Sequence, residues 1–400
     1  MSDAADLLAA FDAGDLLRPD AAEPNLVDLA RAIASVAGVD DIEQTPGVRA
    51  VGAHIGDPQH LVFVVADGLG VNLLERLPPH SFLRRRLVME LRTVFPSTTA
   101  VALTTLATGE WPAQHGITGW WTYLRQVDGA VTVVRFERRM GQVPLGELDV
   151  APEVLFPVPS LVPRMRRDAC CFLPAAIVDS VYSRYIAGGG ARDGYGSLAR
   201  GVDAVIARVA GASGPTYSYL YAPRVDAAAH EYGTHDGHVM AEVLALDQQI
   251  ERLAGALGPR ARVVLTADHG HLNAPQPKRH LINRRSAIAR ALRVPPAYDS
   301  RVMCFHPKPG DGEALAAAVR DQYGETVYLL SVDEVDELRL LGPRPLSALT
   351  RERLGEYVSI VRRDDVLGYR SATGGGEITA LHSQHSGLSP AEMRIPLIVA

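Results

Sequence analysis

The chain has 400 residues, of which 47% are hydrophobic and 22% charged, and its formal net charge is -6 at pH 7. This composition is typical of a folded enzyme, and the acidic balance excludes a protein that holds duplex nucleic acid by broad phosphate neutralisation. The three cysteines do not form a disulfide framework, no apolar run can span a bilayer, and the first 17 residues lack the basic region of a secretory signal. We therefore expect a cytoplasmic protein with no membrane partner.

The first elements in chain order are two segments, residues 4–17 and 25–38, with apolar residues at helical spacing. We expect these N-terminal helices, within residues 1–45, to pack on the core. From residue 60 the pattern changes to short apolar runs that end in Asp, Gly or Thr and are followed by helical stretches, which is typical of buried parallel strands and their crossovers. The clearest strands are 61–66, 217–221 and 262–267, with 396–399 as the last, so we predict an α/β fold.

Residues 301–364 follow a different pattern. A strand is expected at 302–305, a helix at 312–322, and further strands at 326–330 and 357–361. Pro307, Pro309 and Gly310 punctuate the start of this segment, and a loop with Gly374 to Gly376 follows it. We interpret the segment as a small inserted α+β lobe, which leaves residues 1–300 and 365–400 for the catalytic core.

Candidate site residues follow the first three strands, where open α/β sheets place their ligands. Asp67 follows the first strand, and taken alone it is either a metal ligand or the cap of the next helix. Asp226 and His230 are four residues apart after the second strand, so they share one helix face and can reach a single ion, although an ordinary surface pair is the alternative. Asp268 and His269 follow the third strand directly, and this pairing most strongly indicates a metal site.

Thr98 and Thr99 precede a helical stretch that ends at Gly109. A hydroxyl at the start of a helix sits where backbone amides and the helix dipole favour an anion, so a phosphoryl group can be attacked and held there. The alternative is a simple helix cap. Neither threonine is activated without a base or a metal ion.

A polar loop before the last strand contains two histidines, of which we prefer His385 over His382 as a late metal ligand. His271 lies one residue beyond the Asp-His-Gly triplet, and we interpret it as an outer-shell or surface residue. His115 is expected to be structural or to lie behind the ligands.

Five features, taken in chain order, resemble the nucleotide pyrophosphatase/phosphodiesterase branch of the alkaline phosphatase superfamily: the Asp67 strand end, a threonine ten residues before the glycine of a Thr-Gly pair, Asp226-x-x-x-His230, Asp268-His269-Gly270 and a late histidine. The resemblance runs from about residue 62 to residue 399. It implies a mostly parallel central sheet with helices on both faces. Counting back ten residues from Gly109 selects Thr99 over Thr98 as the nucleophile.

The resemblance also implies two divalent metal ions, Zn or Mn, and a ligand set. One ion would be held by Asp67, Thr99, Asp268 and His269, and the other by Asp226, His230 and His385. In such a site one ion lowers the pKa of the attacking hydroxyl and the other stabilises the leaving oxygen. Thr99 would then form a phosphothreonine intermediate that water hydrolyses.

One position departs from the family pattern. Phosphodiesterases of this branch usually carry an asparagine three residues after the nucleophile, where this chain has Ala102. Backbone amides at Thr99 and Ala100, or the side chain of Arg224, are the candidates to replace it as an anion donor. Trp120 and Trp121 follow the nucleophile helix, and they either stack a nucleobase or pack in the core.

The resemblance is strongest to actinobacterial members of this branch, some of which hydrolyse cyclic di-AMP. We therefore expect a metal-dependent phosphodiesterase that takes a small nucleotide substrate, such as cyclic di-AMP or a linear dinucleotide, and releases nucleoside monophosphate. A phosphomonoesterase or a phosphonate hydrolase of the same superfamily is the alternative, because the asparagine is missing. A non-catalytic nucleotide sensor is the third hypothesis.

Overall fold

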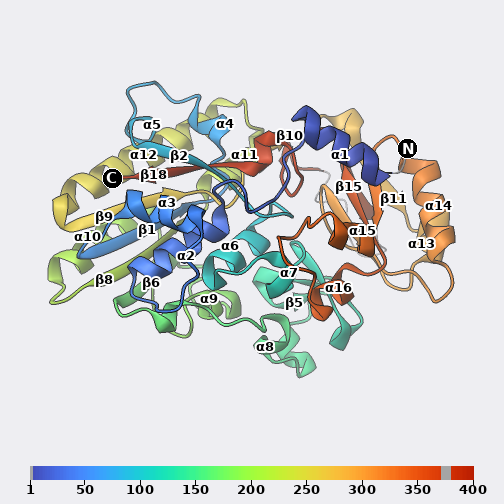
Figure 1. The fold of residues 1–400 in the computed structure, drawn as a ribbon, viewed down its shortest axis with the longest axis horizontal. Coiled ribbons are helices and arrows are strands. Elements are labelled where there is room, and N and C mark those ends of the chain that lie inside the picture. The colour runs from blue at the N-terminus through green and yellow to red at the C-terminus, as the bar shows by residue number, and fades with distance from the viewer. Residues whose placement is uncertain (1–2, 371–379) are drawn as a thin grey trace.

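The computed structural model describes residues 3–370 and 380–400, and its centre is a seven-stranded sheet in the order β2-β18-β9-β1-β8-β6-β7 (Figure 1). The strands are β1 His60–Ala66, β2 Leu87–Arg92, β6 Asp168–Pro174, β7 Ala191–Tyr195, β8 Thr216–Ala222, β9 Ala261–Thr266 and β18 Arg394–Val399. β1 pairs in parallel with β8 and β9, whereas β18 is antiparallel to both of its neighbours. The sheet is therefore mostly parallel, which confirms the predicted α/β class.

Helices cover both faces of this sheet. Helices α2 Leu26–Val36, α3 Pro46–Ile55 and α6 Thr99–Thr108 lie on one face, and α10 Leu198–Gly211 and α12 Gly237–Leu257 lie on the other (Figure 1). Every residue of β1 is buried, as expected for a central parallel strand covered from both sides. In α12 the buried residues recur at helical spacing, as in Val239, Val243 and Leu246, so one stripe of this helix packs on the sheet.

The register of the sheet brings the carboxyl ends of β1, β8 and β9 to the same edge. Ala66 at the end of β1 pairs with Ala222 at the end of β8, and Val65 pairs with Thr266 at the end of β9. Side chains that follow these three strands must therefore lie close together, although more than 140 residues separate β1 from β8 in the sequence.

The predicted lobe contains a four-stranded antiparallel sheet in the order β12-β13-β15-β14, which lies on the right of Figure 1. Its elements are β12 Ala297–Asp299, β13 Val302–Phe305, α13 Ala287–Ala291, α14 Gly312–Tyr323, β14 Val327–Ser331 and β15 Tyr357–Val361. The sheet begins at Ala297, a few residues before the boundary that we expected at residue 301. Next to it, β11 Arg279–Asn283 pairs in parallel with β16 Val366–Arg370. The glycine loop predicted at 374–376 lies outside the described residues.

The two N-terminal helices pack in different places. Helix α2 packs on the core against α3 and α6, as expected. Helix α1 Asp3–Ala13 instead packs on the lobe against β14, with Leu7 buried in the lobe's hydrophobic cluster. Arg362 of the lobe donates a hydrogen bond of 2.7 Å to Asp3. Helical periodicity shows that one face of a helix is buried but not what covers it, so the expected placement of α1 on the core was wrong.

Smaller elements complete the described chain. A three-stranded sheet of β3 Trp121–Leu124, β4 Gly129–Thr132 and β5 Glu137–Arg138 follows the α6 region, and β10 Leu272–Asn273 pairs with β17 Ser383–Gln384. The remaining helices are α4 Val71–Leu74, α5 Phe82–Arg85, α7 Pro112–His115, α8 Pro152–Leu155, α9 Val181–Ile186, α11 Arg224–Tyr232, α15 Val332–Glu337, α16 Ala348–Leu354 and α17 Pro390–Met393. Within residues 3–370 and 380–400, none of the helices has the length and apolar character needed to cross a membrane.

Candidate metal centre

The predicted carboxylates meet at the edge where β1, β8 and β9 end. Asp67 follows β1 directly, Asp226 lies in the first turn of α11 after β8, and Asp268 comes two residues after β9. The turn after Asp268 needs a glycine, because a Cβ atom at Gly270 would lie 2.1 Å from the carbonyl oxygen of Ala391. The short strand pair β10 and β17 then returns the late polar loop to this edge. The chain thus gathers all seven predicted side chains in one place.

One group of ligand atoms surrounds the imidazole of His269. Its Nε2 atom lies 3.2 Å from Thr99 Oγ1, 3.5 Å from Asp67 Oδ1 and 3.4 Å from Asp268 Oδ2. Asp67, Asp268 and His269 are all buried. The facing oxygens Asp67 Oδ1 and Asp268 Oδ2 have no hydrogen-bond partner among the described residues. Since a buried carboxylate oxygen without a partner costs several kcal/mol, a cation between these atoms fits the arrangement.

A second group surrounds Asp226. Its Oδ1 atom lies 3.3 Å from His230 Nε2 and 3.8 Å from His385 Nε2, and the two imidazole nitrogens are 3.2 Å apart. Ligand atoms held about 2.0–2.1 Å from one tetrahedral ion are about 3.3 Å from each other. The spacing of Asp226, His230 and His385 therefore fits a single divalent ion.

Each imidazole of the predicted set is oriented by a hydrogen bond on its other nitrogen. The carbonyl oxygens of Gly270, Ser383 and Ser97 can accept only, so they receive protons from Nδ1 of His269, His230 and His385, respectively. Because neutral imidazole has one N–H, the Nε2 atoms then carry lone pairs that point into the centre. This is the usual arrangement of metal-binding histidines.

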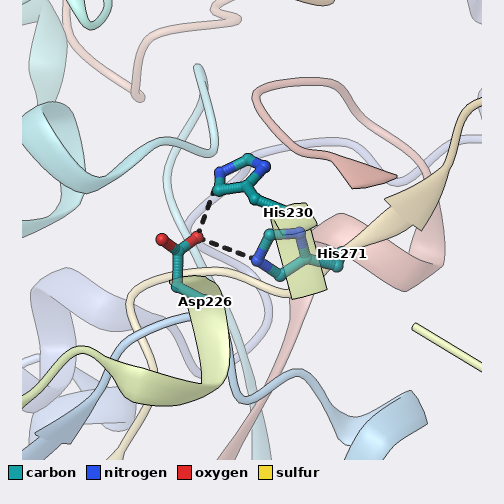
Figure 2. A group of neighbouring side chains, drawn as sticks. All are labelled: Asp226, His230 and His271. Atoms are coloured by element: carbon teal, nitrogen blue, oxygen red, sulfur yellow. Dashed lines mark hydrogen bonds and ion pairs between the residues drawn. The ribbon is translucent and has the colours of Figure 1, made fainter. Parts of the chain in front are cut away.

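His271 is a member of this cluster that the sequence pattern did not predict as a ligand. Its side chain is fully buried, and Nε2 lies 2.9 Å from Asp226 Oδ1, on the same oxygen that faces His230 (Figure 2). Asp226, His230 and His271 form one of three groups in the described chain that could hold a metal ion. The proximity of His271 to Asp268 and His269 in the sequence was the available signal, but the direction of its side chain depends on the pairing of β10 with β17.

The protein environment shifts the pKa values of the clustered groups in opposite directions. Burial, together with the carboxylates of Asp268 and Asp226, raises the pKa of Asp67 well above its usual value. Burial also opposes ionisation of Asp226, but without a metal ion the protonated imidazole of His230, with the imidazole of His271, holds the pKa of Asp226 well below the usual range. Although burial lowers the pKa of His230, the Asp226 carboxylate raises it to about 9. Burial lowers the pKa of His271 to about 4. The centre therefore combines buried carboxylates with imidazoles, which is a donor set suited to Zn or Mn.

Thr99 is the threonine that faces the cluster. It begins helix α6, and its hydroxyl contacts His269, whereas Thr98 is the N-cap residue and makes no capping hydrogen bond. The first amides of a helix have no partner inside the helix. An anion placed next to Thr99 would thus meet both the hydroxyl and the positive end of a ten-residue helix.

A cavity of about 370 Å³ opens beside Thr99, Asp67 and Asp226. Aromatic and aliphatic side chains, among them Trp120, Leu173, Tyr182 and Tyr219, make up most of the remaining lining, which also includes Arg135, Ser180 and Ser183. Its volume lies in the range of small-molecule sites. The cavity therefore places an apolar binding surface next to the polar cluster.

The two tryptophans have different surroundings. Trp120 lines the cavity, in agreement with the stacking hypothesis. Trp121 instead packs against the lobe's hydrophobic clusters, with the guanidinium of Arg139 4.1 Å from its ring centre. The core-packing alternative thus describes Trp121 only.

Arg224 was a candidate to replace the missing asparagine at Ala102, and the structure contradicts this prediction. Its guanidinium is exposed and bonds Glu242 at 2.7 Å, so it is already paired on the outer face of α11. Ala102 itself is buried in the hydrophobic core. Of the two candidate anion donors, the side chain of Arg224 and the amides at the start of α6, only the amides therefore remain.

The other histidines that we considered lie outside the cluster. His382 is exposed, which agrees with the preference for His385. His115 is buried behind helix α6, where its ring bonds Thr105 Oγ1 at 3.0 Å and accepts from the amide of Ile117. His115 therefore has a structural role, which is one of the two roles that we expected for it.

Comparisons with known proteins agree with this architecture. A family model described as type I phosphodiesterase / nucleotide pyrophosphatase matches residues 61–364. The chain is similar in structure to an inactive murine ectonucleotide pyrophosphatase / phosphodiesterase 5 in complex with AMP, with a TM-score of 0.64 and 16% identity over 85% of this chain and 87% of that one. It is also similar to phosphonoacetate hydrolase from Sinorhizobium meliloti in complex with phosphonoformate, with a TM-score of 0.59 and 18% identity over 86% of this chain and 90% of that one. A search of curated proteins found no match.

Proposed function

Because the chain belongs to the type I phosphodiesterase / nucleotide pyrophosphatase family, we propose that it is a two-metal phosphodiesterase that hydrolyses nucleotide phosphodiester bonds. The observation that carries this proposal is that Thr99 lies beside three carboxylates and a set of imidazoles. Two carboxylate oxygens of this cluster, one of Asp67 and one of Asp268, have no hydrogen-bond partner among the described residues. In this centre Asp67, Thr99, Asp268 and His269 hold one cation, and Asp226, His230 and His385 hold the other.

The reaction follows from the position of Thr99 at the start of α6. Its oxygen attacks the phosphorus atom, the bond to the leaving alkoxide breaks, and the remaining nucleotide stays bound to Thr99 as a phosphothreonine ester that still carries its nucleoside. Bound divalent cations supply two effects here, a lower pKa of the attacking hydroxyl and neutralisation of charge on the phosphoryl oxygens. Water then cleaves the bond between the Thr99 oxygen and phosphorus, which releases nucleoside monophosphate and restores the hydroxyl. The amides of Thr99 and Ala100 hold a phosphoryl oxygen in place of the family asparagine.

The cavity supports a nucleotide as the substrate. A base that stacks on Trp120 would lie beside the metal centre, and such a contact is worth about 1–3 kcal/mol. A volume of about 370 Å³ suits one nucleotide better than two, so the second half of a dinucleotide would extend away from the cluster. We propose cyclic di-AMP and linear dinucleotides as substrates and nucleoside monophosphate as the product.

A phosphonate hydrolase is the second candidate. It is favoured by Ala102, which removes the asparagine usual in the diesterases, and by the similarity of the fold to phosphonoacetate hydrolase. The cavity argues against it, because a small phosphonate would leave the apolar surface near Trp120 without a contact.

A substrate panel with matched variants tests the proposal. The protein, reconstituted with Zn or Mn and assayed by chromatography, should release nucleoside monophosphate from cyclic di-AMP and a linear dinucleotide faster than it cleaves p-nitrophenyl phosphate or phosphonoacetate. Thr99→Ala and Asp268→Asn should each lower kcat at least 100-fold and remain folded. Thr108→Ala, at the far end of the same helix, is the matched control and should retain activity. Faster cleavage of phosphonoacetate, or full activity of Thr99→Ala, would refute the proposal.

A further inference from the structure

The cavity next to the metal centre is lined by two groups of polar residues that differ in charge. The carboxylates of Asp67 and Asp226 come from the strand ends. A second group comes from the 3-10 helix η2 Val133–Arg135 and from helix α9, which pack against each other. These two elements contribute the guanidinium of Arg135 and the hydroxyl of Ser183 to the lining. One part of the cavity therefore offers hydrogen-bond donors and positive charge at a distance from the strand ends in the chain.

Arg135 has a guanidinium that can still bind an anion. Among the described residues that line the cavity, it alone carries a positive charge. Its Nη1 atom lies 3.6 Å from Glu137 Oε1, which is close enough for an ion pair but too far for a hydrogen bond. The side chain of Arg135 is 62% exposed, and it has no other partner in the part of the chain that the structure describes. Its N–H donors are therefore available to an acceptor on a substrate.

The backbone holds Arg135 where the cavity opens to solvent. Arg135 and Ile177 are exposed residues of the lining, so they mark this opening. Phe136, which ends η2, is buried in the hydrophobic core and has a φ of 53°, an uncommon value for a bulky residue. Its amide donates to Val133 O at 3.2 Å, and its carbonyl oxygen accepts from the amide of Leu145 at 2.9 Å. The exposed arginine is thus presented by an anchored turn.

Ser183 provides a second donor in the same lining. It is buried, and its Oγ atom accepts a hydrogen bond of 3.0 Å from the hydroxyl of Ser180. A serine hydroxyl has one proton to donate and two lone pairs. Within residues 3–370 and 380–400, no acceptor receives the proton of Ser183. This proton can therefore be donated to an oxygen atom of a bound substrate.

A dinucleotide that carries two phosphate groups places only one of them at Thr99. The other phosphate needs a cation elsewhere, and arginine binds phosphate through short, charge-assisted hydrogen bonds. We propose that Arg135 binds the second phosphate of the dinucleotide, with Ser183 as an additional donor, and thereby selects substrates with two phosphates. The proposal rests on the phosphodiesterase function proposed above and identifies the residue that determines its substrate preference.

Two linear dinucleotides test this inference, one with a 5′-terminal phosphate and one without it, because they share the scissile bond and both bases. Calorimetry on the Zn-loaded Thr99→Ala variant measures binding without turnover. We expect the phosphorylated dinucleotide to bind about tenfold more tightly, and the additional change Arg135→Gln to bring the two Kd values within about twofold of each other. Arg138→Gln, at a neighbouring arginine of β5 that does not line the cavity, is the matched control and should keep the preference.

The outcome separates this inference from the proposed function. Equal Kd values for the two dinucleotides before Arg135 is changed would overturn the inference, and so would an Arg135→Gln variant that weakens both equally. The ratio of KM values for cleavage by the native chain and by Arg135→Gln gives the same comparison without the change at Thr99. If the protein shows the phosphate preference in binding but releases no nucleoside monophosphate, the phosphodiesterase function is wrong and Arg135 remains a phosphate-binding residue.

Discussion

Replacement of Arg301 should reveal the ion pair that joins the lobe to the loop that carries His385. Arg301 precedes β13, and its Nε atom donates to Glu392 Oε1 of α17 at 2.6 Å, with the side chains 1% and 0% exposed, respectively. Glu392 also accepts from the amide of Gly387 at 2.8 Å and from the hydroxyl of Ser389 at 2.6 Å. Next to this pair, Ser300 donates to the carbonyl oxygen of His385 at 2.9 Å.

The magnitude follows from the burial of both charges. Removal of one partner of a buried pair leaves an uncompensated charge and costs about 3–5 kcal/mol. In Arg301→Met the remaining carboxylate keeps its hydrogen bonds from Gly387 and Ser389, so we expect a loss of about 3 kcal/mol in the free energy of unfolding, at the low end of that range. The double variant with Glu392→Gln removes the isolated charge and should recover about 1–2 kcal/mol of this loss.

Urea unfolding at pH 7 of the native chain, both single variants and the double variant measures these differences. Arg85→Met is the matched control, because Arg85 and Glu251 are 3.5 Å apart and each more than half exposed, and such a pair contributes less than about 1 kcal/mol. A loss below about 1 kcal/mol in Arg301→Met, or a double variant less stable than both single ones, would refute the reasoning.

Three further predictions concern other parts of the molecule. Burial lowers the pKa of His115 from 6.5 to about 3, so the unfolded chain binds a proton that the native chain excludes, and the free energy of unfolding should fall as the pH drops from 6.5 toward 3, by at most about 1.4 kcal/mol for each pH unit. Urea unfolding from pH 7 to 5 should therefore show a shallower decline for His115→Gln than for the native chain, and equal slopes would contradict the assignment. Removal of bound metal by a chelator should lower Tm in calorimetry, since a ligand at 100 times its Kd adds about 2.7 kcal/mol, and an unchanged Tm would argue against the buried carboxylates as its site. Trp120→Ala should raise KM for a dinucleotide at least fivefold, in line with about 1 kcal/mol or more of stacking, and an equal KM for both proteins would remove Trp120 from the substrate site.

Much of the fold could be predicted because its strands are continuous apolar runs. β1, β8 and β9 lie within one residue of their predicted limits, and β13 and β15 of the lobe agree with the prediction. The edge strands were missed for a physical reason. β2 alternates exposed and half-buried residues, and β7 contains Arg192 and Asp193, so neither resembles a buried strand.

The candidate site could be predicted where its side chains follow directly on a buried strand. Asp67 follows β1 directly and Asp268 lies two residues after the end of β9. The register of the sheet brings these strand ends to the same edge. His271 and Arg224 depend on the direction of a side chain after a turn, which periodicity does not specify. His271 turns inward because β10 pairs with β17, and Arg224 turns outward toward Glu242.

The position of the lobe in the chain has a consequence for biosynthesis. Asp67 and Asp226 leave the ribosome before Asp268 and His269, more than a hundred residues of lobe and loop follow, and only then does His385 emerge. A growing chain can already bring Asp67, Asp268 and His269 together, but it has an incomplete set of donors around Asp226. Of the two proposed metal positions, one can therefore form while the polypeptide is still being translated, whereas the other must wait until the lobe has folded and β17 has returned to β10.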